Sequence, residues 1–378
     1  LFNQWIDDSN QIDDSWEPIN TDHILLGLKN STNANITIEP GGQIEFSTPP
    51  LTSLNEVNEA FQKHLSQLSQ FIARHQGELV FQGCHPLFTR DVIPLYDKPR
   101  YGIMYPHMKT VGSLGQAMMK QTSSVQVSID YFSMDDLTRR FVFLNRLSPF
   151  ILCLFANSPL FEGRLTGCKS YRGRIWQNTD ACRTGLPETF LSERFQLSDY
   201  VNWARSAGTY SIDRDGQTLN KTNIPFQTLL EDDSIAITQN DWIEHLGTLF
   251  PEVRIKKILE LRSMDMLNPK DAIAIPAMVQ GALHHTKVFD VLFNRLMDIP
   301  IDQFQLIQSA AIQDGMSAQI GSFHIGKFAR SMMEDILSYM TDQQSPWLTP
   351  YFETYTKDLI SPADLLIKDF ESKHNQVL

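Results

Sequence analysis

The sequence predicts an α+β fold, because segments with strand-like alternation occupy its first two-thirds and helical periodicity fills the remainder. Three segments alternate polar and apolar residues: 43–47, 124–130 and 258–262. In each, the polar side chains project to one face and the apolar ones to the other. We expect the strands of the first two-thirds of the chain to build one sheet with helices packed outside.

The chain shows no internal repeat or low-complexity linker, so we expect a single domain over residues 1–378. Residues 1–265 form its sheet-bearing core, and residues 266–378 form a mainly helical part. In the second part, apolar spacing predicts helices over 270–297, 302–313, 325–342 and 361–374.

The clearest helix of the first part is predicted from Ser53 to Gly77, where Ser53 and Glu56 form a capping box and Gly77 supplies the stop. A strand is expected at 78–83, an irregular Pro-rich segment at 84–110, and a helix at about 112–122. Residues 134–155 are predicted to be a buried pair of helices. The long, weakly periodic segment 156–190 has the character of a functional loop.

Composition excludes several classes of protein. The net charge of −12 argues against nucleic-acid binding, which depends on neutralising phosphates with Lys and Arg. No apolar run approaches the roughly 20 residues that span a bilayer, and the first residues are acidic, unlike a signal peptide. Four cysteines without metal-ligand spacing indicate reduced thiols, so we expect a cytoplasmic protein without a regulatory disulfide.

Four ordered segments resemble successive motifs of glutamate–cysteine ligase, in the branch found in plants and many proteobacteria. They are EPGGQIEFSTPPL (39–51), VGSLGQAMMKQTSSVQVSID (111–130), FANSPLFEGRLTGCKSYRGRIWQNTDACRTG (155–185) and DWIEHLGTLFPEVRIKKILELRSMD (241–265). The chain is also similar to the actinobacterial ligase that starts ergothioneine synthesis. The resemblance extends from about residue 1 to about residue 290.

This resemblance implies a glutamine-synthetase-like fold, a curved antiparallel sheet whose concave face is the active site. It also implies an ATP- and Mg²⁺-dependent ligase that joins L-glutamate to L-cysteine through a γ-glutamyl phosphate, the first step to glutathione. Two alternatives stay open: a γ-glutamyl ligase with another amine acceptor or serving another thiol pathway, and a non-catalytic homologue that binds substrate or a partner. The expected partners are small molecules, and the protein is expected to be a monomer or a homodimer.

Positions that match acidic residues of the family motifs imply the metal and nucleotide site. Glu39, Glu45 and Glu260 are expected to bind Mg²⁺, which prefers carboxylate and phosphate oxygens. Arg262 shares a strand face with Glu260, so both are expected to bind ATP, and Arg262 to act in catalysis. Other interpretations are a turn carboxylate for Glu39, and for Arg262 a partner that neutralises Glu260.

Other matches imply the amino-acid sites. Arg172 and Arg100 are expected to hold the substrate glutamate, Arg172 with a catalytic role, because a guanidinium fork suits a carboxylate. Gln126 is expected to hydrogen-bond a bound amino acid, and Tyr210 to contact the cysteine. Arg100 can equally be a surface loop cation. For Arg254, a structural ion pair with Glu252 is the favoured interpretation.

The chain departs from the family pattern in two places. The family has a Gly-x-Glu-x-Glu-like strand followed by a helix, and the sequence from Leu1 onward resembles that helix. One or two acidic ligands of the family therefore have no counterpart here. We expect the parent protein to contain that strand. Ser128 replaces the usual Asn or Cys, a change expected to tune the pocket without abolishing the chemistry.

Overall fold

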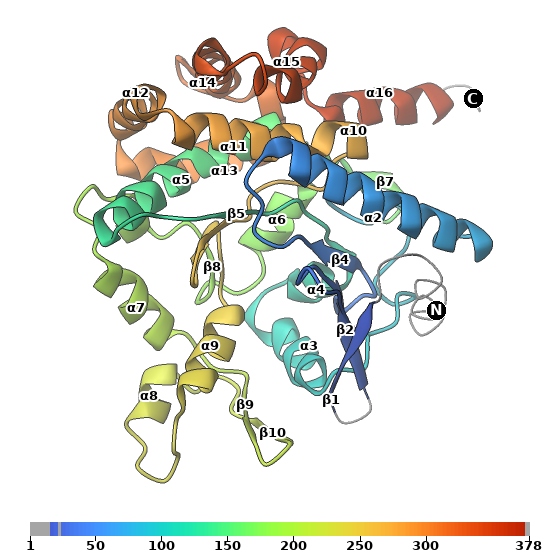
Figure 1. Cartoon of the computed structure of the whole chain (residues 1–378), viewed down its shortest axis with the longest axis vertical. Helices are drawn as coiled ribbons and strands as arrows, with labels where there is room; N and C mark the ends of the chain where they lie inside the picture. Colours follow the sequence, from blue (N-terminus) through green and yellow to red (C-terminus); the bar gives the residue numbers. More distant parts are fainter. Residues whose placement is uncertain (1–15, 22–23, 375–378) are drawn as a thin grey trace.

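Two antiparallel sheets and a layer of helices organise the chain in this computed structural model, which describes residues 16–21 and 24–374. Figure 1 shows α5 and α11–α15 gathered at one end of the molecule. The four-stranded sheet lies below them beside α3 and α4, and α8 with the β9–β10 hairpin forms the opposite end of the molecule. The mixture of helices and strands confirms the predicted α+β class.

The strands form two main sheets and several short ladders. The first sheet has the order β1-β2-β3-β4 and the second has the order β12-β13-β5. The strands of these two sheets are β1 Glu17–Thr21, β2 Ile24–Lys29, β3 Asn35–Ile38, β4 Ile44–Ser47, β5 Val127–Ile129, β12 Val253–Ile255 and β13 Leu259–Leu261. The short pairs are β6 Leu160–Phe161 with β7 Arg164–Leu165, β8 Thr184–Gly185 with β11 Phe250–Pro251, β9 Ser211–Arg214 with β10 Gln217–Asn220, and β14 Gln319–Ile320 with β15 Phe323–His324.

The expectation of one sheet is wrong for the described residues, because the strands pair as separate sheets. The predicted strand at 78–83 is also absent there, since these residues carry no regular secondary structure. Most strands are only two to four residues long, and so the alternation of polar and apolar residues located them without specifying which strands pair.

Helices make up most of the remaining described chain. The α-helices of the first part are α2 Leu54–Arg74, α3 Pro99–Val111, α4 Gly115–Gln121, α5 Met134–Leu154, α6 Tyr171–Gln177, α7 Leu197–Ser206, α8 Phe226–Leu230 and α9 Gln239–Gly247. Those of the second part are α10 Pro269–Ala272, α11 Ala274–His284, α12 Thr286–Met297, α13 Phe304–Asp314, α14 Ile325–Tyr339, α15 Thr349–Thr354 and α16 Pro362–His374. The predicted helical character after residue 266 is therefore confirmed.

The helix α2 begins as predicted, with the side chains and main chains of Ser53 and Glu56 forming the capping box. It ends earlier than Gly77, at Arg74. Gln76, with φ 56°, takes the left-handed conformation, and the Gly77 amide bonds the Ile72 carbonyl. The helix thus ends three residues before the predicted stop, and the left-handed residue is Gln76, not Gly77.

The helix α5 is a single buried helix, not the predicted pair. Ser133 caps it by accepting a hydrogen bond from the Asp136 amide, and its residues from Phe141 onward are buried. Pro149 does not break it, because the Ser148 hydroxyl bonds the Asn145 carbonyl that the proline leaves without a partner. The helix packs on α12, α13 and α14, and on β12 and β13 of the second sheet.

The segment 84–110, expected to be irregular, contains the helix α3. Pro99 stands at its first turn, where proline is well tolerated because that amide has no helical partner. The start of α3 and the end of β3 lie together, since Lys98 and Tyr101 both hydrogen-bond the Ile38 carbonyl.

Candidate functional site

The sheet β12-β13-β5 has one apolar face and one polar face. Leu259 and Leu261 of β13 pair with Ile129 and Val127 of β5, and these residues face the core around α5. Glu260 lies between Arg254 of β12 and Ser128 of β5 in the register. We use the term polar face for Arg254, Lys256, Glu260, Arg262 and Gln126, which project from the side opposite the leucines.

Two arginines hold the carboxylate of Glu260 at the centre of the polar face. Arg254 donates to both oxygens over 2.8 Å, and Arg262 contacts the same carboxylate. Burial alone would raise the pKa of Glu260, but Arg262 and Arg254 outweigh it and lower the pKa to about 2. Arg254 therefore pairs with Glu260 and not with Glu252, which corrects the predicted ion pair.

The rest of the polar face is cationic. Arg262 also donates to the Gln126 amide oxygen over 3.0 Å, which fixes its guanidinium. Lys256 follows Arg254 by two residues, is exposed, and has no ion pair or hydrogen bond from its ammonium among the described residues. With three cations and one carboxylate, this face attracts anions such as phosphates.

A tight turn between β3 and β4 carries the other two predicted acids, and we call residues 38–45 the acid turn. Gly42 bonds the Glu39 carbonyl over 2.9 Å with φ 82°, a conformation that favours glycine. Gly41 packs so tightly on Lys120 that an added Cβ would lie 2.3 Å from its carbonyl oxygen. Gln43 bonds the Met119 and Thr122 carbonyls, and so the turn is anchored on α4.

The acid turn and the polar face border the same region. Burial raises the pKa of Glu45 to about 7, Glu39 adds to this rise, and Arg262 opposes it. Glu45 is nevertheless exposed, so part of its carboxylate meets water. Among the described residues, no group of three or more His, Cys, Asp or Glu side chains is placed to hold a metal ion.

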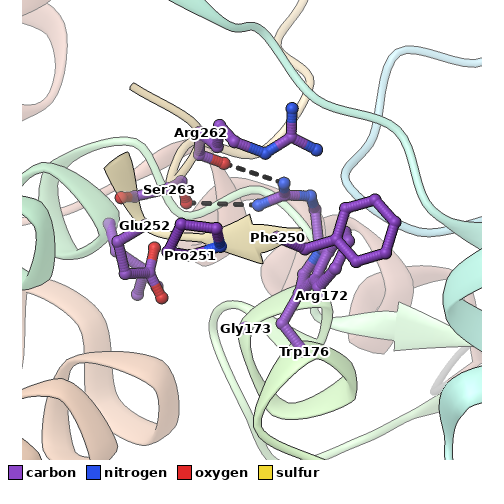
Figure 2. Close-up of a pocket in the computed structure, with 9 residues that line it drawn as sticks. Arg172, Gly173, Trp176, Phe250, Pro251, Glu252, Arg262 and Ser263 are labelled. Carbon is purple, nitrogen blue, oxygen red and sulfur yellow. Dashed lines mark hydrogen bonds between the residues drawn. The ribbon is translucent and has the colours of Figure 1, made fainter. Parts of the chain in front are cut away.

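Arg172 projects from the first turn of α6 toward the end of β13. Its two terminal nitrogens donate to the main-chain oxygens of Ser263 (3.2 Å) and Arg262 (2.9 Å), as Figure 2 shows. The side chain is buried and lines a recess with Phe250 and Glu252. A guanidinium has five N–H donors, so three of them have no hydrogen-bond partner among the described residues.

Comparison with known sequences places the chain in a family. The profile described as glutamate-cysteine ligase family 2 matches residues 3–321. The chain belongs to the glutamate–cysteine ligase family.

Curated relatives from plants extend the match. The chain is 30% identical over 370 residues to a protein of Medicago truncatula, with 96% of this chain and 72% of the relative covered. It is 32% identical to a protein of Brassica juncea, covering 86% of this chain and 64% of the relative. A protein of Arabidopsis thaliana is 29% identical, with 96% and 70% covered. All three relatives are named glutamate–cysteine ligase, chloroplastic.

Within this member of the glutamate–cysteine ligase family, the predicted site residues separate into two groups. Glu45 and Glu260 lie with Arg262 and Gln126 around the polar face, Glu39 lies on the acid turn, and Arg172 binds the strand that carries Arg262. Arg100 and Tyr210 form no hydrogen bond or ion pair with these residues in the part of the chain that the structure describes.

Arg100 stands in the first turn of α3 and not in a loop, half-exposed and 3.3 Å from Glu244 of α9. Tyr210 is buried in a second core cluster, with its ring 4.0 Å from the Arg183 guanidinium and its hydroxyl 3.9 Å from the Met108 sulfur. Burial raises the pKa of Tyr210 well above its usual range. The structure therefore points its hydroxyl into the core.

Sequence reasoning missed two lysines beside the acids. Lys98 donates to the Ile38 carbonyl over 2.9 Å next to the acid turn; burial lowers its pKa and the charge of Glu39 opposes this. Lys256 lies on the polar face. The signal for Lys256 was present, because Arg254 and Lys256 have the same two-residue spacing as Glu260 and Arg262. Lys98 had no local signal, since its neighbour Glu39 is distant in sequence.

Proposed function

We propose that the protein is an ATP- and Mg²⁺-dependent ligase that forms γ-glutamylcysteine from L-glutamate and L-cysteine, the first step of glutathione biosynthesis. The observation that carries the proposal is the family match over residues 3–321. The acid turn beside a cationic sheet face supports it, because such chemistry needs both a metal and a phosphate site.

Forming an amide from a carboxylate requires activation, since hydroxide is a poor leaving group. The γ-carboxylate of glutamate attacks the terminal phosphorus of ATP, which releases ADP and leaves a γ-glutamyl phosphate. The cysteine amine then attacks the acyl carbon, the bond to phosphate breaks, and the amine proton passes to solvent. Arg262 and Lys256 are the residues we assign to the phosphate oxygens, with Arg262 stabilising the charge that develops during transfer.

The acid turn suits magnesium. Burial is the main cause that raises the pKa of Glu45, and the charge of Glu39 adds to it, so a divalent cation would stabilise both carboxylates in their ionised form. Mg²⁺ retains several waters, so Glu39 and Glu45 with phosphate oxygens suffice as ligands, and the bound ion would neutralise phosphate charge. Glu260 would join them only if Arg254 or Arg262 released one of its oxygens.

The amino-acid sites follow from the remaining donors. We assign the glutamate carboxylate to the free N–H groups of Arg172, with Gln126 and Arg100 as further contacts. The cysteine side is assigned to Tyr210, which would require its ring and not its hydroxyl to form the contact, because the hydroxyl faces Met108.

The proposed fold is glutamine-synthetase-like, with the two observed sheets, which do not pair with each other in the described chain, as neighbouring parts of one curved surface and the site on its concave side. In the described residues, no helix is long and apolar enough to cross a bilayer. We propose a cytoplasmic monomer or homodimer, although the plant relatives are named as chloroplastic.

The test is an ADP-release assay with glutamate and a varied second amino acid. We expect cysteine to raise ADP release well above the rate without an acceptor, and γ-glutamylcysteine to appear by mass spectrometry. A larger rate with another amine would support the alternative acceptor. No ADP release with any acceptor, from folded protein that binds glutamate, would support the non-catalytic homologue.

A further inference from the structure

Asp265 is a buried carboxylate four residues beyond the end of β13. It accepts hydrogen bonds from the Asn157 amide (2.8 Å), the Ser158 hydroxyl (2.7 Å) and the Ser170 hydroxyl (3.0 Å). It forms no ion pair within the described residues, and the side chain is 1% exposed. A buried carboxylate is costly, so three donors converging on it require an explanation.

The two serines connect Asp265 to the first turn of α6. Because each hydroxyl donates to Asp265, its oxygen lone pairs are directed toward α6. Ser158 accepts from the Arg172 amide over 3.1 Å, and Ser170 accepts from the Gly173 amide over 3.2 Å. These are helix N-terminal amides, which have no partner within the helix. Asp265 thereby fixes the main chain of Arg172 through Ser158.

The side chain of Arg172 connects α6 back to the chain segment that carries Asp265. Its guanidinium bonds the carbonyls of Arg262 and Ser263, three and two residues before Asp265. The helix thus holds the strand end through Arg172, and the strand end holds the helix through Asp265. Neither segment can shift without breaking both connections.

We propose that Asp265, with Ser158 and Ser170, is a positioning unit that sets Arg172 relative to Arg262. The inference rests on the proposed function, in which Arg172 binds the glutamate carboxylate. Apolar residues of similar volume could fill this space at a lower free-energy cost. The cost of desolvating buried polar groups often exceeds the stability that their interactions provide. The polar arrangement supplies a defined orientation of Arg172 instead.

Asp265→Asn can fail to fold, so the serine variants carry the test. Ser158→Ala removes the link between Asp265 and the Arg172 amide. Ser148→Ala is the matched control, because Ser148 is equally buried and its hydroxyl bonds a carbonyl in α5, away from α6. We expect Ser158→Ala to raise the KM for glutamate about tenfold, as for one buried hydrogen bond, with the KM for ATP within about twofold.

A double variant separates positioning from general stability. If Ser158 acts through Arg172, adding Ser158→Ala to Arg172→Lys should raise the glutamate KM by less than about twofold more. Equal increases in both KM values, full additivity in the double variant, or the same effect from Ser148→Ala would overturn the proposal.

Hydrogen exchange gives a readout that does not depend on activity. The amides of Arg172 and Gly173 should exchange about tenfold faster in Ser158→Ala than in Ser148→Ala. If the wild type releases no ADP, the proposed function fails, while faster exchange still supports the positioning unit. Unchanged exchange would overturn it, whatever the activity.

Discussion

The acid turn and the polar face differ in whether their carboxylates are neutralised by neighbouring cations. On the polar face, Glu260 lies between Arg254 and Arg262, and its pKa falls to about 2. On the acid turn, burial and then the charge of Glu39 raise the pKa of Glu45 to about 7. The two regions border each other, yet one carries its own counter-ions and the other has two carboxylates competing for positive charge.

This difference indicates separate roles for the two regions. The polar face is assembled by its sheet pairing and would keep its shape with or without a ligand. The acid turn is anchored through Gln43 and Gly41, so its geometry is fixed while its charge is not balanced. A site of this kind would gain most from a bound cation.

The largest effect is expected from Glu260→Gln. It would leave two arginines without their counter-ion, so the free energy of unfolding should fall by about 3 kcal/mol. Turnover should fall on the order of 100-fold or more, because Arg262 loses one of the two side chains, Glu260 and Gln126, that orient it. Urea unfolding and steady-state ADP release measure the two effects.

A compensating variant sharpens that result. Glu260→Gln combined with Arg254→Met restores the charge balance and should recover stability but not turnover. Full recovery of turnover would limit Glu260 to neutralising Arg254. A folded Glu260→Gln protein within a few-fold of wild-type turnover would remove Glu260 from the site.

Arg172→Lys should have the next largest effect. Lysine keeps the charge but loses the fork that bonds both carbonyls and leaves donors for substrate. The KM for glutamate should rise about 30-fold, equivalent to about 2 kcal/mol, with little change in the KM for ATP. Kinetics with each substrate varied in turn decides this. A parallel loss of ATP affinity would make Arg172 a phosphate residue.

A smaller effect is expected from Lys256→Met, with Lys257→Met as its matched control. Both lysines are exposed in the same hairpin, and by strand alternation only Lys256 shares the polar face. The KM for ATP should rise about tenfold for Lys256 and less than about twofold for Lys257, with the difference shrinking at high salt. Equal effects of the two changes would place Lys256 outside the phosphate site.

The smallest effect concerns Glu45→Gln and pH. The folded pKa of Glu45 lies above its usual value of 4.5, so the unfolded chain binds fewer protons than the folded one between pH 4.5 and about 7. Wild-type stability should therefore fall across this range, and the Gln variant should not share the loss. At about pH 8 the variant should be more stable by about 1 kcal/mol, a value reduced for screening because Glu45 is exposed. Parallel pH curves for the two proteins would show that Glu45 carries no such charge strain.

The sequence predicted the parts of the fold that depend on local chemistry. Local sequence was enough to predict the α+β class, the capping box of α2 and the helices after residue 266, because caps and apolar spacing depend on residues only a few positions apart. The division into two sheets was not, since three-residue strands do not specify their partners. The single helix α5 was missed because the hydroxyl of Ser148 offsets Pro149, an interaction that periodicity does not reveal.

The candidate site shows the same limit. Alternation correctly placed Glu260 and Arg262 on one strand face, and their resemblance to family motifs selected them among many charged residues. The predicted partner of Arg254, Glu252, was wrong. Glu260 lies opposite Arg254 because of the β12–β13 register, which the sequence does not reveal. Lys98 and the contacts of Asp265 depend on segments far apart in the chain, so spacing alone could not find them.

The central claim is that the acid turn holds magnesium against a nucleotide bound by the polar face. Calorimetric titration of ATP into wild type and Glu45→Gln, each with and without Mg²⁺, tests it most directly. We predict that Mg²⁺ strengthens ATP binding to the wild type by at least about tenfold, and by less than about threefold in the variant. An equal gain from Mg²⁺ in both proteins would contradict the claim.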